Sequence, residues 1–237
     1  MIKNKSVICI IPARGGSKGV AKKNIKFFLG KPLINWTISE AKKSKYIDSL
    51  IVSTDDEKTA FEARKAGAEV PFKRPKYLAR DQSPMIDVIL HAENWLKTRG
   101  SKYDVILLLQ PTSPLRTAED IDSALKLFIS KKAESVVSVC AAEHHPYLSN
   151  RIDSDKRMKG FLKLNKISEY RQGLPRFYRV NGAIYIAYGG YLRKHKSFFG
   201  NKTFAYIMPP ERSVDIDSQN DFDYAEYLKK KSGDDAK

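Results

Sequence analysis

A basic, glycine-rich loop follows the first apolar run of the chain. The run covers residues 7–11, the loop reads PARGGSKG at 12–19, and Lys22, Lys23 and Asn24 follow shortly after. Adjacent glycines allow the backbone to approach a ligand closely, so that successive N–H groups can cradle phosphate oxygens, while basic side chains add charge-assisted donors. The loop has neither the GxGxxG nor the GxxxxGK[ST] spacing. We therefore predict a phosphate site of another kind, with a basic surface turn as the alternative.

Two carboxylates stand close together near the other end of the chain, in the segment SVDID at 213–217. In an extended segment alternate residues point to the same side, so Asp215 and Asp217 should face one way. Paired carboxylates near a phosphate loop are what a Mg²⁺ ion shared with a nucleotide requires. The alternative is that Asp217 and Ser218 only cap the helix that follows.

A third polar segment, QPTSPLR at 110–116, comes directly after an apolar run. Its two prolines fix the backbone, and we expect them to aim Gln110 and Arg116 into the crevice at the strand ends. The alternative is a rigid loop with helix-capping residues.

A fourth group lies around a later apolar run. Arg171 precedes this run, and Arg179 and Asn181 stand at its beginning. Two guanidinium groups and an amide could hold a carboxylate together with amide or hydroxyl groups of a ligand. Purely structural arginines are the alternative at this point.

The elements that must position these residues alternate along the chain. Strands are predicted at 7–11, 49–54, 69–72, 105–109, 135–140, 179–188 and 204–208, and helices at 32–43, 56–66, 85–98, 118–130 and near 221–230. This alternation favours βαβ units and a mainly parallel sheet covered on both faces, with ligands at the carboxyl ends of the strands. We expect one domain over 1–237. The polar segment at about 143–175 is interpreted as an insertion that folds on itself or on a partner, with a hairpin turn at 153–156.

The composition is that of a folded protein. The chain has 237 residues, of which 42% are hydrophobic and 30% charged, which excludes a disordered class. No apolar run approaches the roughly 20 residues that cross a bilayer, and the first run is too short for a signal peptide, so we expect a cytoplasmic protein. Cys9 and Cys140 lie in apolar runs and are predicted to be buried free thiols.

The net charge is +16, from 43 Lys and Arg against 27 Asp and Glu. This balance favours an anionic partner, which could be a nucleic acid, a membrane surface or a phosphorylated small molecule. The lysines are scattered in pairs and triplets rather than gathered in one block with aromatic residues. The unusual residues instead follow strand ends, so small anionic substrates are predicted, without nucleic acid or membrane as a partner.

Six segments in this order resemble the acylneuraminate cytidylyltransferase family, which includes enzymes that make CMP-sialic acid and related CMP-legionaminate-type synthetases. The segments are 11–19 with Lys23 and Asn24, 110–116, 143–146, 171–175, 179–186 and 213–217. The resemblance implies an α/β fold, namely a nucleotide-diphospho-sugar-transferase-like sandwich with a mainly parallel sheet. It also implies a small dimerisation insertion at about 143–175 and hence a homodimer.

The resemblance also implies a reaction and a set of site residues. The reaction is transfer of CMP from CTP to the anomeric hydroxyl of a nonulosonic (sialic) acid, with release of pyrophosphate. Catalysis is assigned to Arg14, Lys23, Asp215 and Asp217, and the two aspartates are the implied ligands of Mg²⁺ or Mn²⁺. The implied nucleotide-binding residues are Arg14, Gly16, Ser17, Lys23, Asn24, Arg74 and Ser83. The implied sugar-binding residues are Gln110, Arg171, Arg179, Asn181, Tyr185, Phe198 and Phe199.

The sequence departs from the family pattern at one informative place. Some members that use N-acetylneuraminate have a lysine where this chain has Leu148. The expected substrate is an N-acylneuraminate, and the alternatives are legionaminate or another sialic-acid-like sugar and then the eight-carbon acid Kdo. A distant alternative from another class is a nucleic-acid-binding protein. His144 and His145 are adjacent, and neighbouring residues on a strand point oppositely, so a structural role is expected for them.

Overall fold

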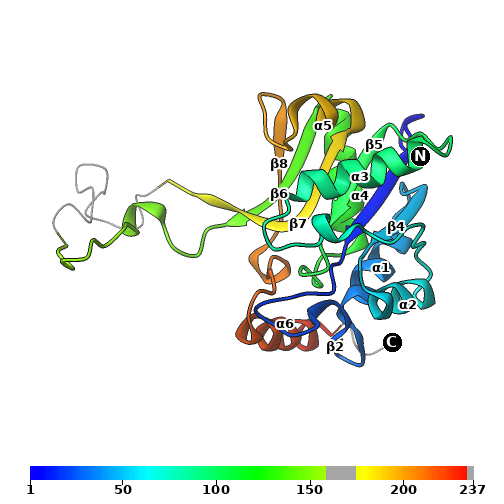
Figure 1. Cartoon of the computed structure of the whole chain (residues 1–237). Coiled ribbons are helices and arrows are strands. Elements are labelled where there is room, and N and C mark those ends of the chain that lie inside the picture. Colours follow the sequence, from blue (N-terminus) through cyan, green and yellow to red (C-terminus); the bar gives the residue numbers. More distant parts are fainter. Residues whose placement is uncertain (159–174, 234–237) are drawn as a thin grey trace.

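Six strands form one central sheet with helices packed on both faces (Figure 1). The computed structural model describes residues 1–158 and 175–233. The strands are β1 (Val7–Pro12), β2 (Phe27–Phe28), β3 (Lys31–Pro32), β4 (Ser49–Ser53), β5 (Val105–Leu109), β6 (Ser135–Ala141), β7 (Tyr178–Tyr188) and β8 (Thr203–Ile207). The helices are α1 (Leu33–Lys43), α2 (Glu57–Lys65), α3 (Met85–Lys97), α4 (Ala118–Ser130), α5 (Gly189–His195) and α6 (Gln219–Lys231). None of the helices in the described part is long and apolar enough to cross a bilayer.

The strand order of the sheet is β4-β1-β5-β7-β6-β8. β1 pairs in parallel with β4 and β5, and β6 pairs in parallel with β8, whereas β7 is antiparallel to both of its neighbours. The prediction of a mainly parallel sheet is therefore confirmed. Because β7 runs against the other strands, its first residues lie at the same edge as the carboxyl ends of β1 and β5. This edge gathers the polar segments that the sequence places far apart.

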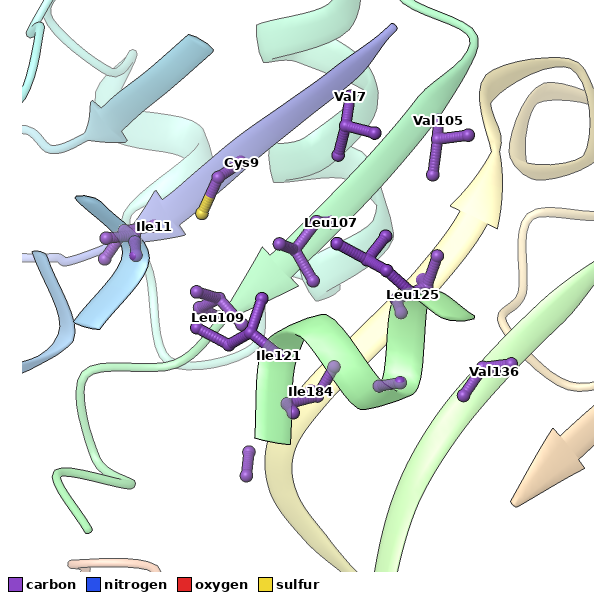
Figure 2. Packing of buried hydrophobic residues seen from close by; sticks show 14 of the residues in the cluster. Val7, Cys9, Ile11, Val105, Leu107, Leu109, Ile121, Leu125, Val136 and Ile184 are labelled. Atoms are coloured by element: carbon purple, nitrogen blue, oxygen red, sulfur yellow. The ribbon is translucent and has the colours of Figure 1, made fainter. Parts of the chain in front are cut away.

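The core forms two layers, one on each face of the sheet. Residues Val7, Cys9 and Ile11 of β1 face α1 and α4, as Figure 2 shows for α4, and the alternate residues Ile8 and Ile10 face α3 and α5. A strand buried on both faces needs a continuous apolar sequence, which explains the unbroken run in β1. Cys9 and Cys140 are buried and free, as predicted.

Local signals in the sequence account for several of the helix ends. The Asp56 carboxylate accepts a hydrogen bond of 2.8 Å from the Thr59 N–H at the start of α2, and Gly67, just after its end, has a φ of +86°. Thr117 and Asp120 form a capping box at the start of α4.

One prediction about an element was wrong, and one helix was not predicted. The segment 69–72 is not a strand, because it meets the β4 edge only through isolated bridges at Glu69 and Lys73. α5 was missed because this seven-residue helix begins with Gly189 and Gly190, and glycine is a poor helix former.

A narrow arm extends from the sheet away from the body of the protein (Figure 1). Its described part consists of 142–158 and 175–177, and its base is closed by a 2.9 Å hydrogen bond from the Ala142 N–H to the Phe177 carbonyl. The His145 ring lies 4.5 Å from the Phe177 ring and 4.9 Å from the Tyr147 ring, so His145 packs structurally. A turn forms at 153–156, but no strands flank it within the described residues.

A buried ion pair connects α4 to the segment that carries the two carboxylates. The Asp120 side chain is 1% exposed and accepts hydrogen bonds of 2.8 and 2.9 Å from Arg212, which stands just before 213–217. Burial alone would raise the pKa of Asp120, but the hydrogen bonds from Arg212 and Thr117 outweigh it and hold this pKa below its ordinary value.

Replacing Asp120 by asparagine should therefore lower the free energy of unfolding by about 2 kcal/mol at pH 7. The loss is smaller than for a fully buried ion pair because Arg212 is partly exposed to solvent. The pKa of Asp120 in the folded protein lies below the value of about 3.9 in the unfolded chain. Such a carboxylate stabilises the folded state fully at pH values above about 3.9, and this stabilisation is lost as the pH falls through the pKa of the folded protein. The difference between the two proteins should thus shrink below about pH 4. Urea unfolding at pH 7 and pH 3 measures this, and a difference that grew on acidification would contradict it.

Candidate active site

A cavity of about 410 Å³ opens at the carboxyl ends of β1 and β5. It collects nine of the residues predicted for the site, together with Lys18, Arg80 and Asp81. The nine are Arg14, Ser17, Lys23, Asn24, Arg74, Ser83, Gln110, Asp215 and Asp217. Five basic residues and three aspartates thus line one cavity, which suits a polyanionic ligand with room for a cation.

The glycine-rich loop and the 215–217 segment are held against each other. The Lys23 ammonium donates to the Ile216 carbonyl and lies 3.3 Å from an Asp217 carboxylate oxygen. A Cβ added at Gly19 would lie 1.8 Å from the Asp217 carbonyl oxygen, so only glycine permits this approach. The Asn24 amide donates to the Arg14 carbonyl at 2.8 Å and fixes the loop from within. The loop residues and the aspartates therefore form one structural unit.

Gln110 and Asp215 converge on a glycine of β7. Gly182 has a φ of +75°, and a Cβ at this position would lie 2.8 Å from the Gln110 amide oxygen and 3.0 Å from an Asp215 carboxylate oxygen. The segments 110–116 and 213–217 therefore meet at Gly182, in the first half of β7. Sequence reasoning named both side chains but gave Gly182 no role.

Asp215 is the more sheltered of the two aspartates. Burial raises its pKa, and the nearby charge of Asp217 adds to this, while a hydrogen bond from Thr112 acts in the opposite direction. Burial also raises the pKa of Tyr185, with a further contribution from Asp215. A partly buried carboxylate beside a second, exposed carboxylate favours a bound cation, because the cation offsets both the burial of charge and the repulsion.

The donor set fits Mg²⁺ or Mn²⁺ only in part. No group of three metal-ligating side chains exists in the described part of the chain. The chain supplies the two oxygen-donor carboxylates of Asp215 and Asp217, and Mg²⁺ is commonly held by one or two carboxylates with the remaining positions filled by substrate phosphates and water. The site therefore fits an ion that arrives with a phosphorylated ligand.

The far wall of the cavity comes from residues 74–88. Arg74 is 4% exposed and donates from Nε to the Ser53 hydroxyl at 3.0 Å and from its Nη2 to the Ser53 carbonyl. Burial lowers the pKa of Arg74 to about 10, so it remains charged at neutral pH. The Ser83 hydroxyl donates to the Tyr77 carbonyl at 2.8 Å and accepts from the Arg80 N–H. Ser83 thus shapes the turn that lines this wall.

The prediction for Arg116 was wrong. Instead of pointing into the crevice, its side chain is 1% exposed and donates to the Ala183 carbonyl at 2.7 Å, to the Thr37 hydroxyl at 2.9 Å and to the Gln110 carbonyl at 3.3 Å. Arg116 therefore supports Gln110 from behind.

Asn181 has a similar place behind the site. It is 1% exposed, donates to the Ser213 hydroxyl at 2.9 Å and accepts from the Ser138 hydroxyl at 2.6 Å. Its amide is therefore committed to joining β6, β7 and the 213–217 segment, and direct sugar binding by this side chain has no support in the structure.

The other sugar-binding candidates lie outside the lining of this cavity. Arg179 pairs with Glu143 at 3.1 Å at the base of the arm. Tyr185 packs against Phe198 with ring centroids 5.3 Å apart, Phe198 is buried and Phe199 is 57% exposed. Gly16 is also absent from the cavity lining, and Arg171 lies outside the described residues. The sugar-binding roles stay predictions.

Sequence reasoning missed Arg80 and Asp81. Both follow a short 3₁₀ helix at Lys76–Leu78 rather than a strand, so a search of strand ends could not find them. Their charge is the signal that could have identified them. Arg80 and Asp81 are adjacent and oppositely charged, and they lie between Pro75 and Pro84 in a segment that cannot be helical throughout.

Known proteins resemble this chain over nearly its whole length. A family model described as cytidylyltransferase matches residues 8–235. Post-translational flagellin modification protein B of Campylobacter coli is 34% identical over 228 residues, which cover 94% of each chain. N-acylneuraminate cytidylyltransferase of Escherichia coli is 37% identical over 226 residues, and CMP-N,N'-diacetyllegionaminic acid synthase of Legionella pneumophila is 34% identical over 223 residues. The match covers 95% of the Legionella protein but 52% of the Escherichia coli protein, so the chain spans about half the length of the latter.

Solved structures share the fold. CMP:2-keto-3-deoxy-manno-octonic acid synthetase in complex with CTP superposes with a TM-score of 0.71 at 14% identity, covering 96% of this chain and 99% of that one. A 4-diphosphocytidyl-2C-methyl-D-erythritol synthase superposes with a TM-score of 0.67 at 14% identity, covering 95% and 98%. With a basic cavity at the strand ends and the family match over residues 8–235, the chain belongs to the cytidylyltransferase family and is a CTP-dependent nucleotidyltransferase.

Proposed function

We propose that this enzyme transfers CMP from CTP to the anomeric hydroxyl of a nonulosonic acid and releases pyrophosphate. The observation that carries the proposal is the convergence of Asp215 and Asp217 with five basic side chains at one sheet edge. Relatives named for N-acylneuraminate, diacetyllegionaminate and pseudaminate support this class of acid. An N-acylneuraminate is the first candidate, and legionaminate is the alternative that the nearly full-length match to the Legionella synthase favours.

The cavity would act mainly by positioning and by fixed positive charge. Negative charge builds on the phosphoryl oxygens and on the leaving pyrophosphate as the bond to the α-phosphorus breaks. Arg14 and Lys23 lie in the cavity, and their charges would stabilise the triphosphate and its departure. Because both substrates are anions, the net charge of +16 would also speed their encounter with the enzyme.

Asp215 and Asp217 would hold the metal ion, Mg²⁺ or Mn²⁺. When bound, such an ion supplies neutralisation of phosphate charge and a template that orients the reacting groups. Gln110, a predicted sugar-binding residue, lies close to Asp215 at Gly182. A sugar acid bound by Gln110 would therefore lie at the same edge of the sheet as the two carboxylates.

The arm would complete the enzyme as a homodimer. Its described part and the adjoining start of β7 expose the large apolar side chains Ile152, Met158, Tyr178 and Val180, between 43% and 57% of each. Exposed apolar residues on a projecting segment are typical of a surface that another chain covers. The same region carries Arg179, so a partner would lie near the predicted sugar-acid end.

Pyrophosphate release from CTP tests the reaction and the acid together. The assay contains Mg²⁺ and one acid at a time, namely N-acetylneuraminate, diacetyllegionaminate, pseudaminate or Kdo. We expect release with a nine-carbon acid and little with Kdo. A folded protein that binds CTP but releases no pyrophosphate with any acid of the panel would refute the proposed function.

A further inference from the structure

One carboxylate in the cavity pairs with cations that a phosphate would need. Asp81 lies 2.6 Å from the Arg14 guanidinium through one oxygen and 2.7 Å from the Lys18 ammonium through the other. Arg14 and Lys18 belong to the glycine-rich loop, whereas Asp81 belongs to the opposite wall, before α3. All three side chains line the cavity, so the two contacts span it.

The pairing resembles the way in which a phosphate group would bind. A carboxylate offers two oxygens to two donors, as a phosphate does. A hydrogen bond from Lys18, and then one from Arg14, hold the pKa of Asp81 below its ordinary value, so Asp81 is ionised at neutral pH. The Asp81 side chain is 41% exposed and that of Lys18 is 81% exposed, and ion pairs open to solvent are weak. A ligand with several negative charges can therefore displace it.

From these contacts we infer that Asp81 is a specificity-determining residue that occupies a phosphate position until a polyphosphate displaces it. This inference rests on the proposed function, because it takes the cavity as the triphosphate site. Both proposed substrates are anions and the cavity is cationic, so the sugar acid could bind there in the wrong place. A single carboxylate gains little by replacing Asp81, whereas a triphosphate brings more charge than it removes. Asp81 thereby reserves Arg14 and Lys18 for the nucleotide.

The test uses inorganic tripolyphosphate without metal, with calorimetry on the full chain. Asp81→Asn removes the competing charge and keeps the shape, and we expect it to bind tripolyphosphate roughly fivefold more tightly than the wild type. Glu57→Gln is the matched control, because Glu57 pairs with Lys73 at 3.0 Å on α2 outside the cavity lining. This control makes the same change in net charge and should leave the affinity unchanged. Asp81→Ser is a second variant, which also removes the charge but has no amide. It should bind tripolyphosphate more tightly as well, whether or not the asparagine of Asp81→Asn forms new hydrogen bonds.

Each outcome has a separate meaning. Unchanged or weaker binding by both Asp81 variants would overturn the inference, and so would equal tightening by Glu57→Gln, which would reveal a general charge effect. A second readout is inhibition by N-acetylneuraminate of CTP binding, which should strengthen in Asp81→Asn only. A wild type that binds tripolyphosphate but makes no CMP-sugar would refute the proposed function and leave the inference standing. Absence of tripolyphosphate binding in all proteins would overturn the inference by itself.

Discussion

Replacing Asp215 by asparagine should lower kcat by about 10³-fold or more, with little change in fold. The substitution keeps the size of the side chain and removes the more sheltered of the two carboxylates. Asp215 lies in the cavity, and its raised pKa arises from burial and from Asp217. A metal ion bound there would contribute several kcal/mol to the stabilisation of the transition state, and each 1.36 kcal/mol lost corresponds to a tenfold lower rate.

The matched control for this experiment is Asp223→Asn. Asp223 lies on α6, is exposed and accepts a hydrogen bond from Gln219, and it is absent from the cavity lining. This change of net charge should leave kcat within about twofold of the wild type, as expected for a surface substitution. Thermal unfolding of both variants shows whether the fold is kept. An Asp215→Asn enzyme with more than a tenth of the wild-type kcat would exclude Asp215 from the catalytic role.

Most of the fold could be predicted because local and global signals agree. The continuous apolar runs of β1 and β5 predict strands buried on both faces, and both are interior strands of the sheet. The antiparallel direction of β7 could not be predicted from the sequence. The pattern of apolar residues indicates that a strand is buried, but it does not specify which strands pair with it or in which direction. The segment 69–72 has the composition of a strand but meets β4 at isolated points only.

The site was predictable where its residues follow strands and obscure elsewhere. Carboxyl ends of parallel strands share an edge, so Arg14, Gln110 and Asp215 could be expected to meet. Burial is what the sequence does not show. Arg116 and Asn181 stand among site residues in the chain, yet both side chains are buried and form hydrogen bonds to carbonyl and hydroxyl groups behind the cavity.

These buried residues explain how a site made of loops can be held in place. Arg116 contacts the carbonyls of Gln110 and Ala183, and Asn181 contacts the Ser213 hydroxyl. The first interaction joins the 110–116 segment to β7, and the second joins β7 to the 213–217 segment. Gly182 lies between these two anchors, so its lack of a side chain decides how closely the functional groups can approach.

Gly182→Ala should therefore cost activity far more than stability. The φ of +75° at Gly182 is strained for alanine, at about 1–3 kcal/mol, and the added Cβ would lie 2.8 Å from the Gln110 amide and 3.0 Å from the Asp215 carboxylate. Both side chains must move, and a misplacement of about 1 Å can lower the rate by about 10²-fold. We expect kcat/KM to fall by at least that factor.

Gly100→Ala separates the two effects of this substitution. Gly100 has a φ of +81°, and an added Cβ would meet nothing within 4 Å, so this variant carries the same backbone strain without a collision. Both variants should lose a similar free energy of unfolding in urea, while only Gly182→Ala should lose activity. If Gly182→Ala kept kcat/KM within threefold of Gly100→Ala, Gln110 and Asp215 would not need their present positions. The close approach at Gly182 would then be a matter of packing rather than of catalysis.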